Sequence, residues 1–153
     1  MGREILDLPA PPADVRLPYG TDQFQFGDLR LPQSAGPHPV AIVVHGGFWR
    51  AQYGLEYAGH LCAALAHAGI ATWNLEYRRI GNPGGAWPNT FLDVAQGADY
   101  LRVLAEKYPL DLKRVITAGH SAGVDCWRGC SPGRQIVLML TNSRRPKVSS
   151  SRP

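Results

Sequence analysis

Arg114-Val115-Ile116-Thr117-Ala118-Gly119-His120-Ser121-Ala122-Gly123 is the stretch that decides the fold. Its first half is apolar and rich in β-branched residues, which predicts a buried strand. Its second half has the pattern Gly-x-Ser-x-Gly. A strand that runs into this pattern is typical of a nucleophile elbow, a sharp turn that exposes a serine hydroxyl above a sheet. Glycines flank the serine because the turn forces backbones together. The pentapeptide alone is also compatible with an ordinary turn rich in glycine and serine.

A second motif, further upstream, favours the elbow. The apolar run at residues 40–44 predicts a central strand covered on both faces, and His45-Gly46-Gly47 follows it directly. Adjacent glycines after a buried strand allow backbone N–H groups to turn towards a ligand. An enzyme that transfers acyl groups needs such donors for the oxyanion of its tetrahedral intermediate. A lone His-Gly-Gly would indicate only a glycine turn, but the two motifs together are much more specific than either one.

The remaining pattern alternates strands with helices. Period-two alternation predicts strands at 14–19 and 23–31 around a turn at 20–22, and 70–75 is a further apolar strand. Apolar residues at helical spacing predict helices over 55–68 and 90–104, the second opened by Thr90 and Asp93 as a capping box. This alternation implies an α/β fold with a mostly parallel sheet and helices on both faces. Ligands bind such sheets at the carboxyl ends of the strands, where both motifs fall.

Composition narrows the class of protein. A chain of 153 residues with 44% hydrophobic and 18% charged residues predicts one globular domain and excludes a disordered chain. No apolar run is long enough to span a bilayer and residues 1–12 lack a signal-peptide core, so we expect no membrane partner. Three cysteines (Cys62, Cys126 and Cys130) do not make a disulfide framework, which favours a reducing cytoplasm.

The net charge of +4 comes from the end of the chain. Residues 1–123 hold ten Lys/Arg and eleven Asp/Glu, whereas residues 124–153 hold six Lys/Arg and one Asp. These positive charges are scattered and lack the interleaved aromatic residues of a nucleic-acid module, so we expect no nucleic-acid partner.

The sequence resembles the α/β-hydrolase esterases and lipases, in the branch that contains kynurenine formamidase-like and carbohydrate-esterase-like (BD-FAE) enzymes. The resemblance covers residues 15–123. Besides the elbow, it rests on Pro18-Tyr19-Gly20, His45-Gly46-Gly47-Phe48-Trp49-Arg50, Glu76-Tyr77-Arg78-Arg79 and Gly84-Gly85-Ala86-Trp87-Pro88. It implies a partial α/β-hydrolase sheet with an N-terminal β-hairpin and without the C-terminal half of the fold. It also implies a small carboxylic ester or an N-formyl aryl amide as substrate, and we expect no cofactor or metal.

By this resemblance Ser121 is the nucleophile, and the backbone N–H groups of Gly46, Gly47 and Ala122 form the oxyanion hole. The expected substrate pocket is lined by His45, Phe48, Trp49, Trp87 and His120. The implied mechanism is acyl transfer in two steps. Ser121 attacks the carbonyl, a histidine oriented by a carboxylate takes its proton, and water then cleaves the acyl-enzyme.

The sequence departs from the family pattern after Gly123. These hydrolases have the order Ser, then Asp/Glu, then His, yet Asp125 is the only carboxylate after Ser121 and no histidine follows. Residues 124–133 show little helical periodicity, and Ser-Pro breaks it. When residues 124–133 are reverse-translated and read from the third base of each codon, the possible codons permit Gly-Leu-Leu-Ala-Trp-Leu-Phe-Ala-Arg. This peptide is an apolar helix of the kind expected there. Our hypothesis is a frameshift after Gly123, which an unshifted frame in verified DNA would refute.

These observations divide the chain into three parts. We expect a loose lead-in (1–14), the N-terminal half of an α/β-hydrolase domain (15–123) and a basic, largely disordered tail (124–153) in which 135–140 is a candidate strand. The open edge of the elbow strand then favours self-association. Without a triad acid and histidine the chain is expected to be inactive as it stands. The alternative is a non-catalytic remnant that binds a ligand or a partner.

Overall fold

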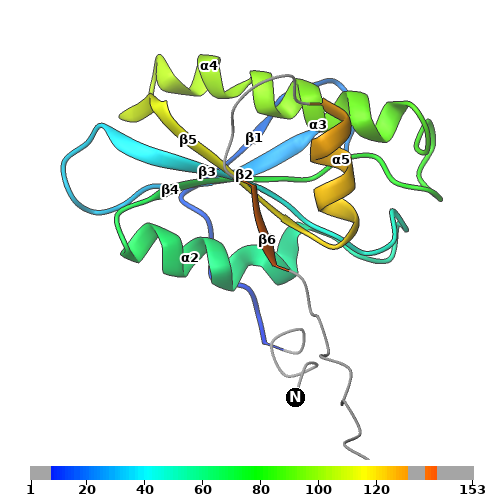
Figure 1. The fold of residues 1–153 in the computed structure, drawn as a ribbon, viewed down its shortest axis with the longest axis horizontal. Helices are drawn as coiled ribbons and strands as arrows, with labels where there is room; N and C mark the ends of the chain where they lie inside the picture. Colours follow the sequence, from blue (N-terminus) through cyan, green and yellow to red (C-terminus); the bar gives the residue numbers. More distant parts are fainter. Residues whose placement is uncertain (1–7, 131–136, 141–153) are drawn as a thin grey trace, which may run out of the picture.

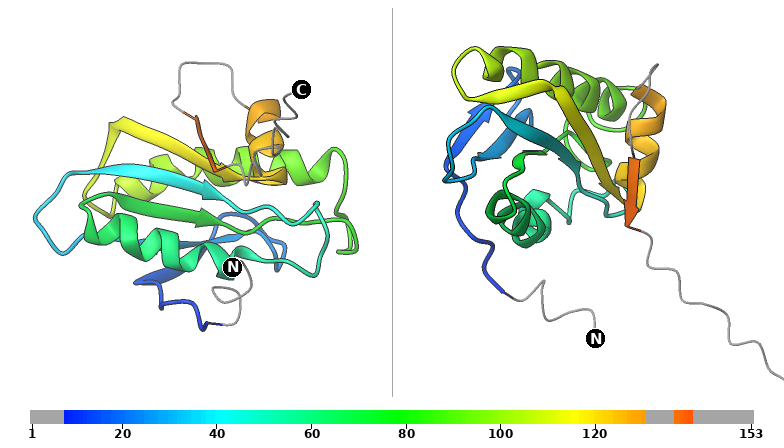
Figure 2. Two further views of the ribbon diagram at one scale, coloured as in Figure 1. Left: turned by 60° about the horizontal axis from the view of Figure 1, so that its bottom comes forward. Right: turned by 60° about the vertical axis from the view of Figure 1, so that its left-hand side comes forward.

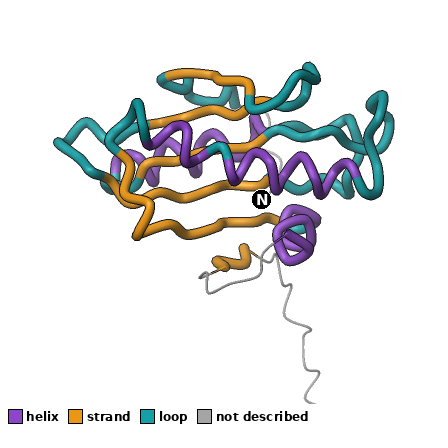
Figure 3. The backbone as a smooth tube through the Cα atoms, turned by 90° about the horizontal axis from the view of Figure 1, so that it is seen from above, coloured by secondary structure: helices purple, strands orange, loops and turns teal. Residues whose placement is uncertain are grey.

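A computed structural model describes residues 8–130 and 137–140, with side chains over residues 8–126. At its centre is a six-stranded sheet in the order β1-β2-β4-β3-β5-β6. Figure 3 shows strands of this sheet running side by side. The strands are β1 (Val15–Pro18), β2 (Phe26–Arg30), β3 (His38–Val44), β4 (Ala71–Leu75), β5 (Leu110–His120) and β6 (Val137–Leu140).

The sheet is mostly parallel, as predicted. β3 pairs with β4 and β5 in parallel, β5 pairs with β6 in parallel, and the antiparallel hairpin of β1 and β2 joins the sheet through β4. Residues 40–44 of β3 are all buried, as the continuous apolar run indicated. The register pairs Val44 with both Leu75 and Gly119, so the carboxyl ends of the three central strands reach the same edge of the sheet.

Helices cover both faces of this sheet (Figures 1 and 2). The short 3-10 helix η1 (Leu55–Ala58) and α2 (Gly59–His67) lie on one face, and α3 (Asn89–Asp99) and α4 (Leu101–Ala105) lie on the other. α5 (Ala122–Cys130) packs beside α3. A small core on the α2 side contains Cys62, and a larger one on the α3 side surrounds Trp73. None of the described helices combines the length and the apolar character needed to cross a membrane.

The structure corrects two expectations about the end of the chain. α5 continues to Cys130, through the stretch expected to have little helical periodicity. The candidate strand is confirmed as β6, which pairs with residues 117–120 of β5. The edge of the elbow strand that we expected to be open is therefore covered along these residues. Residues 1–7 of the lead-in, and residues 131–136 and 141–153 of the tail, lie outside the described residues.

The expected capping box at Thr90 and Asp93 is wrong. No side chain caps the first turn of α3, and the Thr90 hydroxyl instead donates to the Arg78 carbonyl oxygen at 2.6 Å. The Asp93 carboxylate, 1% exposed, accepts two hydrogen bonds from the Arg78 guanidinium at 2.7 and 2.8 Å and one from the Gln25 amide at 2.7 Å. Asp93 therefore connects α3 to the segment after β4 and to the hairpin.

Cys62 is a buried small hydrophobe, as predicted from its position on the apolar stripe. Burial raises the pKa of its thiol to about 11, so the sulfur is protonated and unreactive at neutral pH. Cys126 is buried as well.

Two aspartates of α3 allow a matched test of the Asp93 contacts. Asp93→Ala leaves the Arg78 guanidinium and the Gln25 amide without their buried acceptor, so we expect the free energy of unfolding to fall by about 3–5 kcal/mol. Asp99 forms only an exposed ion pair with Arg102, at 3.2 Å, so Asp99→Ala should leave stability unchanged. Urea unfolding of the two variants measures both effects, and equal losses would contradict the assignment.

Candidate active site

Residues 119–123 form a sharp turn between β5 and α5. Ser121 lies alone between the last residue of β5 and the first residue of α5, and its φ of +52° is in the left-handed region that residues with side chains rarely adopt. A Cβ on Gly123 would lie 2.7 Å from the His45 carbonyl oxygen, and one on Gly119 would lie 2.9 Å from the backbone nitrogen of Val124. Only glycine fits at these two positions, and the exposed Ser121 has the strand–turn–helix setting of an elbow.

The loop after β3 packs directly against this turn. A Cβ on Gly46 would lie 3.0 Å from Cβ of Ser121 and 3.2 Å from Nδ1 of His120, so this approach requires glycine. The backbone of the loop is itself unusual, because Gly47, Phe48 and Trp49 have φ values of +115°, +54° and +56°. The structure therefore brings together the two motifs that the sequence analysis singled out.

A tyrosine that the sequence analysis did not single out connects the two motifs. The Gly46 N–H donates to the hydroxyl oxygen of Tyr57, and this hydroxyl lies 3.3 Å from Nδ1 of His120. The rings of Tyr57 and His120 meet edge to face, with centroids 5.7 Å apart. Burial raises the pKa of Tyr57 to about 12, and the Gly46 N–H opposes this with a smaller effect. Of the three N–H groups expected in an oxyanion hole, that of Gly46 is already engaged.

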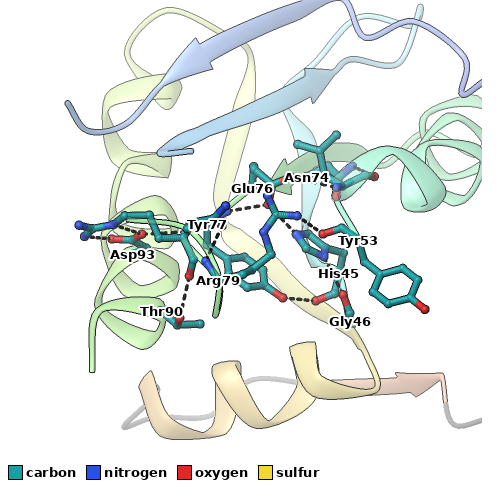
Figure 4. Close-up of polar contacts among 12 residues, drawn as sticks. His45, Gly46, Tyr53, Asn74, Glu76, Tyr77, Arg79, Thr90 and Asp93 are labelled. Carbon is teal, nitrogen blue, oxygen red and sulfur yellow. Dashed lines mark hydrogen bonds and ion pairs between the residues drawn. The ribbon is translucent and has the colours of Figure 1, made fainter. Parts of the chain in front are cut away.

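A buried carboxylate holds the elements around this loop together (Figure 4). Glu76, directly after β4, has Oε1 2.8 Å from Nε2 of His45 and 3.4 Å from Nη2 of Arg79. The same oxygen accepts the Tyr77 N–H at 3.0 Å, and Oε2 accepts the Leu55 N–H at 3.2 Å. Glu76 thus fixes the end of β3, the end of β4 and the start of η1 relative to one another.

The structure corrects the place of His45, which we expected in the substrate pocket. The residue is completely buried, so it has no surface for a substrate. Its ring stacks on that of Tyr77 with centroids 4.4 Å apart, and Nδ1 lies 2.8 Å from the Gly46 carbonyl oxygen. A trans peptide points its C=O and N–H in opposite directions, so this contact turns the Gly47 N–H away from the ring. His45 orients the loop.

The other four expected pocket residues differ in exposure. Phe48 is 70% and Trp87 77% exposed, and Trp87 meets Phe91 edge to face with centroids 5.2 Å apart. Trp49 is half-buried and its indole N–H donates to Sγ of Cys126 at 3.1 Å, while the half-buried His120 faces Tyr57. None of these residues lines the two cavities of about 340 and 470 Å³ that flank Arg30.

Among the side chains described around Ser121, none is a base bonded to its hydroxyl. Over residues 8–126, no hydrogen bond joins the Ser121 hydroxyl to an imidazole or a carboxylate, and Asp125 is exposed on α5. In the same part of the chain, no group of three or more His, Cys, Asp or Glu residues could hold a metal ion. The described structure thus brings the Ser121 side chain against the glycine loop that follows β3.

Comparison with known families decides the lineage. The BD-FAE family model matches residues 28–126, a segment that contains both motifs. The chain belongs to the BD-FAE family. The resemblance inferred from the sequence and the α/β-hydrolase fold are thereby confirmed.

Solved structures agree with this assignment. The BD-FAE chain is similar to a bacterial heroin esterase, with 27% identity and a TM-score of 0.69 over 84% of this chain and 42% of that one. It is similar to a truncated form of a carbohydrate esterase from gut microbiota, with 25% identity and a TM-score of 0.65 over 75% and 44% of the two chains. It shares its fold with an esterase of the Planctomycetes species Thermogutta terrifontis, with 18% identity and a TM-score of 0.68 over 75% and 44%.

The BD-FAE chain spans less than half the length of each of these three structures. No protein of curated function matches its sequence.

Sequence reasoning missed two residues of the site, Glu76 and Tyr57. Glu76 carried a usable signal, because it directly follows an apolar strand and belongs to one of the stretches that carry the resemblance. A carboxylate at the carboxyl end of a strand next to His45 could have been paired with that histidine. Tyr57 carried no such signal, because its partners Gly46 and His120 are distant in the sequence and come near it only in the fold.

Two glutamates test the supporting role of the Glu76 carboxylate. Glu76→Ala leaves Arg79 and the ring of His45 without their buried acceptor, so we expect the protein to lose about 3–5 kcal/mol of stability. Glu56→Ala, a matched variant at an exposed position of η1, should change stability little. Thermal melting followed by circular dichroism gives both values. A Glu76→Ala protein that melts with the wild type would show that the network does not support the loop.

Proposed function

We propose that this chain carries the nucleophile and the oxyanion donors of a serine hydrolase that cleaves small carboxylic esters or an N-formyl aryl amide. The observation that carries the proposal is the close approach of the two motifs, since a Cβ on Gly46 would lie 3.0 Å from Cβ of Ser121. Membership of the BD-FAE family and similarity to structures named as esterases add support.

The reaction is acyl transfer through Ser121. Oγ attacks the carbonyl carbon, and the carbonyl oxygen becomes an oxyanion that accepts hydrogen bonds from the N–H groups of Ala122 and Gly47. A base takes the serine proton and returns it to the departing alcohol or amine. Water then releases the carboxylic acid from the acyl-enzyme by the same steps.

We expect this chain to lack the base for this reaction. No histidine follows His120 in the sequence, and over residues 8–126 no imidazole reaches the Ser121 hydroxyl. A serine hydroxyl without a base is a weak nucleophile. We propose that this chain binds its substrate without turning it over. We also propose a cytoplasmic location, because three cysteines do not make a disulfide framework.

A second candidate function is binding of a ligand or partner without catalysis. Phe48 and Trp87 are large and exposed, which favours contact with an apolar group. Self-association through the sheet edge, now formed by β6, belongs to this candidate. Sedimentation of the purified chain separates a monodisperse binding protein from one that aggregates.

Acetylation of Ser121 tests the hydrolase proposal. We expect p-nitrophenyl acetate to leave the wild-type chain unmodified, because the hydroxyl has no base. Free imidazole can replace a missing histidine, so its addition should produce a chain carrying one acetyl group, detected by intact-mass spectrometry and lost on hydroxylamine treatment.

The controls are two serine variants of the same chain. Ser121→Ala should abolish the imidazole-dependent acetylation, and Ser34→Ala, at an exposed loop position, should leave it intact. Equal acetylation of wild type and Ser121→Ala would refute the proposal and leave the binding role. A burst of p-nitrophenol without imidazole, lost in Ser121→Ala, would show that a base is present after all.

A further inference from the structure

Tyr57 is the side chain that reaches both halves of the proposed site. It lies on η1, whose first N–H is held by Glu76 at 3.2 Å, so its position is set by the same carboxylate that holds His45. Its ring meets the rings of His45 and His120 edge to face, with centroids 6.1 and 5.7 Å apart. The ring is thus fixed on two sides, and its hydroxyl points to the gap between Gly46 and His120.

The direction of the hydrogen bond to Gly46 follows from the groups involved. An amide N–H can only donate, so the Tyr57 oxygen accepts from Gly46. The single hydrogen of the hydroxyl is then free to donate, and Nδ1 of His120, at 3.3 Å, accepts it in the tautomer that carries the ring proton on Nε2. Because the Gly46 N–H already donates to the phenol oxygen, it cannot at the same time donate a full-strength hydrogen bond to a substrate oxygen.

We propose that the Tyr57 hydroxyl, in place of the Gly46 N–H, donates to the carbonyl oxygen of the substrate, next to the N–H groups of Gly47 and Ala122. The inference rests on the function proposed above. On binding, the O–H turns about the C–O bond from Nδ1 of His120 to the substrate oxygen, and no covalent bond forms or breaks. Tyr57 is thereby a catalytic residue that stabilises the oxyanion.

Two features of the site favour this role. The Gly46 N–H polarises the phenol oxygen and so makes the O–H a stronger donor, because hydrogen bonds in a chain reinforce one another. Burial keeps the hydroxyl protonated at neutral pH, with its pKa raised to about 12, so the hydrogen needed for donation is present. The loop backbone is not displaced, since Gly46 keeps the partner it already has.

The opposite role for Tyr57 is a plug that occupies the oxyanion position and must leave before a substrate binds. The two roles predict opposite effects of removing the hydroxyl. If Tyr57 is a donor, Tyr57→Phe weakens binding of an oxyanion. If it is a plug, Tyr57→Phe frees the Gly46 N–H and strengthens binding.

Binding of acetate and acetamide to the full chain distinguishes these roles without requiring turnover. Acetate presents a negative oxygen to the donors, and acetamide has the same shape with a neutral oxygen. Titrations of ¹⁵N-labelled protein are followed at the amides of Gly47 and Ala122. Because a hydrogen bond to a charged group contributes more than one to a neutral group, we expect Tyr57→Phe to weaken acetate binding about tenfold or more, and acetamide clearly less.

Two further variants control the experiment. Tyr53→Phe removes a hydroxyl from a tyrosine whose ring packs against Gly47, and should leave both affinities unchanged. His120→Ala removes the acceptor that competes for the Tyr57 hydrogen, and should tighten acetate binding. The dispersion of the amide spectrum reports whether each variant is folded.

Each outcome bears on the inference. Unchanged or tighter acetate binding by Tyr57→Phe would overturn it and identify Gly46 as the donor. Equal weakening of acetate and acetamide would assign Tyr57 a structural role only, and weaker acetate binding by His120→Ala would contradict the expected competition. If acetate moves neither the Gly47 nor the Ala122 amide of the wild type, the proposed function itself fails, and the inference with it.

Discussion

The buried carboxylate of Glu76 is the interaction on which the rest of the site depends. It accepts hydrogen bonds from the start of η1 and from the segment after β4, and it faces the ring of His45 at 2.8 Å. Burying a carboxylate is costly unless opposite charge and hydrogen bonds compensate it, and Arg79 at 3.4 Å supplies that charge. The Glu76 carboxylate, which follows β4, therefore fixes both the loop that carries Gly46 and the helix η1 that carries Tyr57.

Close packing of backbones is the second constraint. Gly46 lies against Ser121, and Gly123 lies against the carbonyl oxygens at the end of β3, so the two loops touch without intervening side chains. This contact needs β3 and β5 to be neighbours with Val44 opposite Gly119, which the register provides. The glycines are thus a requirement of the strand pairing, because any side chain at these positions would push the two loops apart.

The sequence predicted what depends on periodicity and missed what depends on distant contacts. Strands, helices and the meeting of two motifs at one sheet edge followed from apolar spacing and from the rule for parallel sheets. Asp93 fitted a capping pattern, but Arg78, brought near by the fold, is a stronger partner for its carboxylate than a backbone N–H. His45 was expected in the pocket because it belongs to the motif after β3. Its burial against Tyr77 depends on the folded structure and is not visible in the sequence. The helix α5 formed where Cys126 could join the core, although the local pattern was weak.

The geometry also bears on how the proposed oxyanion binding relates to proton transfer. The proposed nucleophile, N–H donors and Tyr57 lie on the loop after β3, on η1 and at the turn between β5 and α5. The hydrogen bond from Gly46 to Tyr57 and the close approach of Gly46 to Ser121 join these segments. Among residues 8–126, no imidazole or carboxylate is hydrogen-bonded to the exposed Ser121 hydroxyl. In serine hydrolases the oxyanion hole and the binding site alone retain roughly 10³–10⁴-fold acceleration over water when the triad is removed. On the proposed function, a chain that keeps this half of the site keeps the part that would recognise an acyl group, even where the proton has no acceptor.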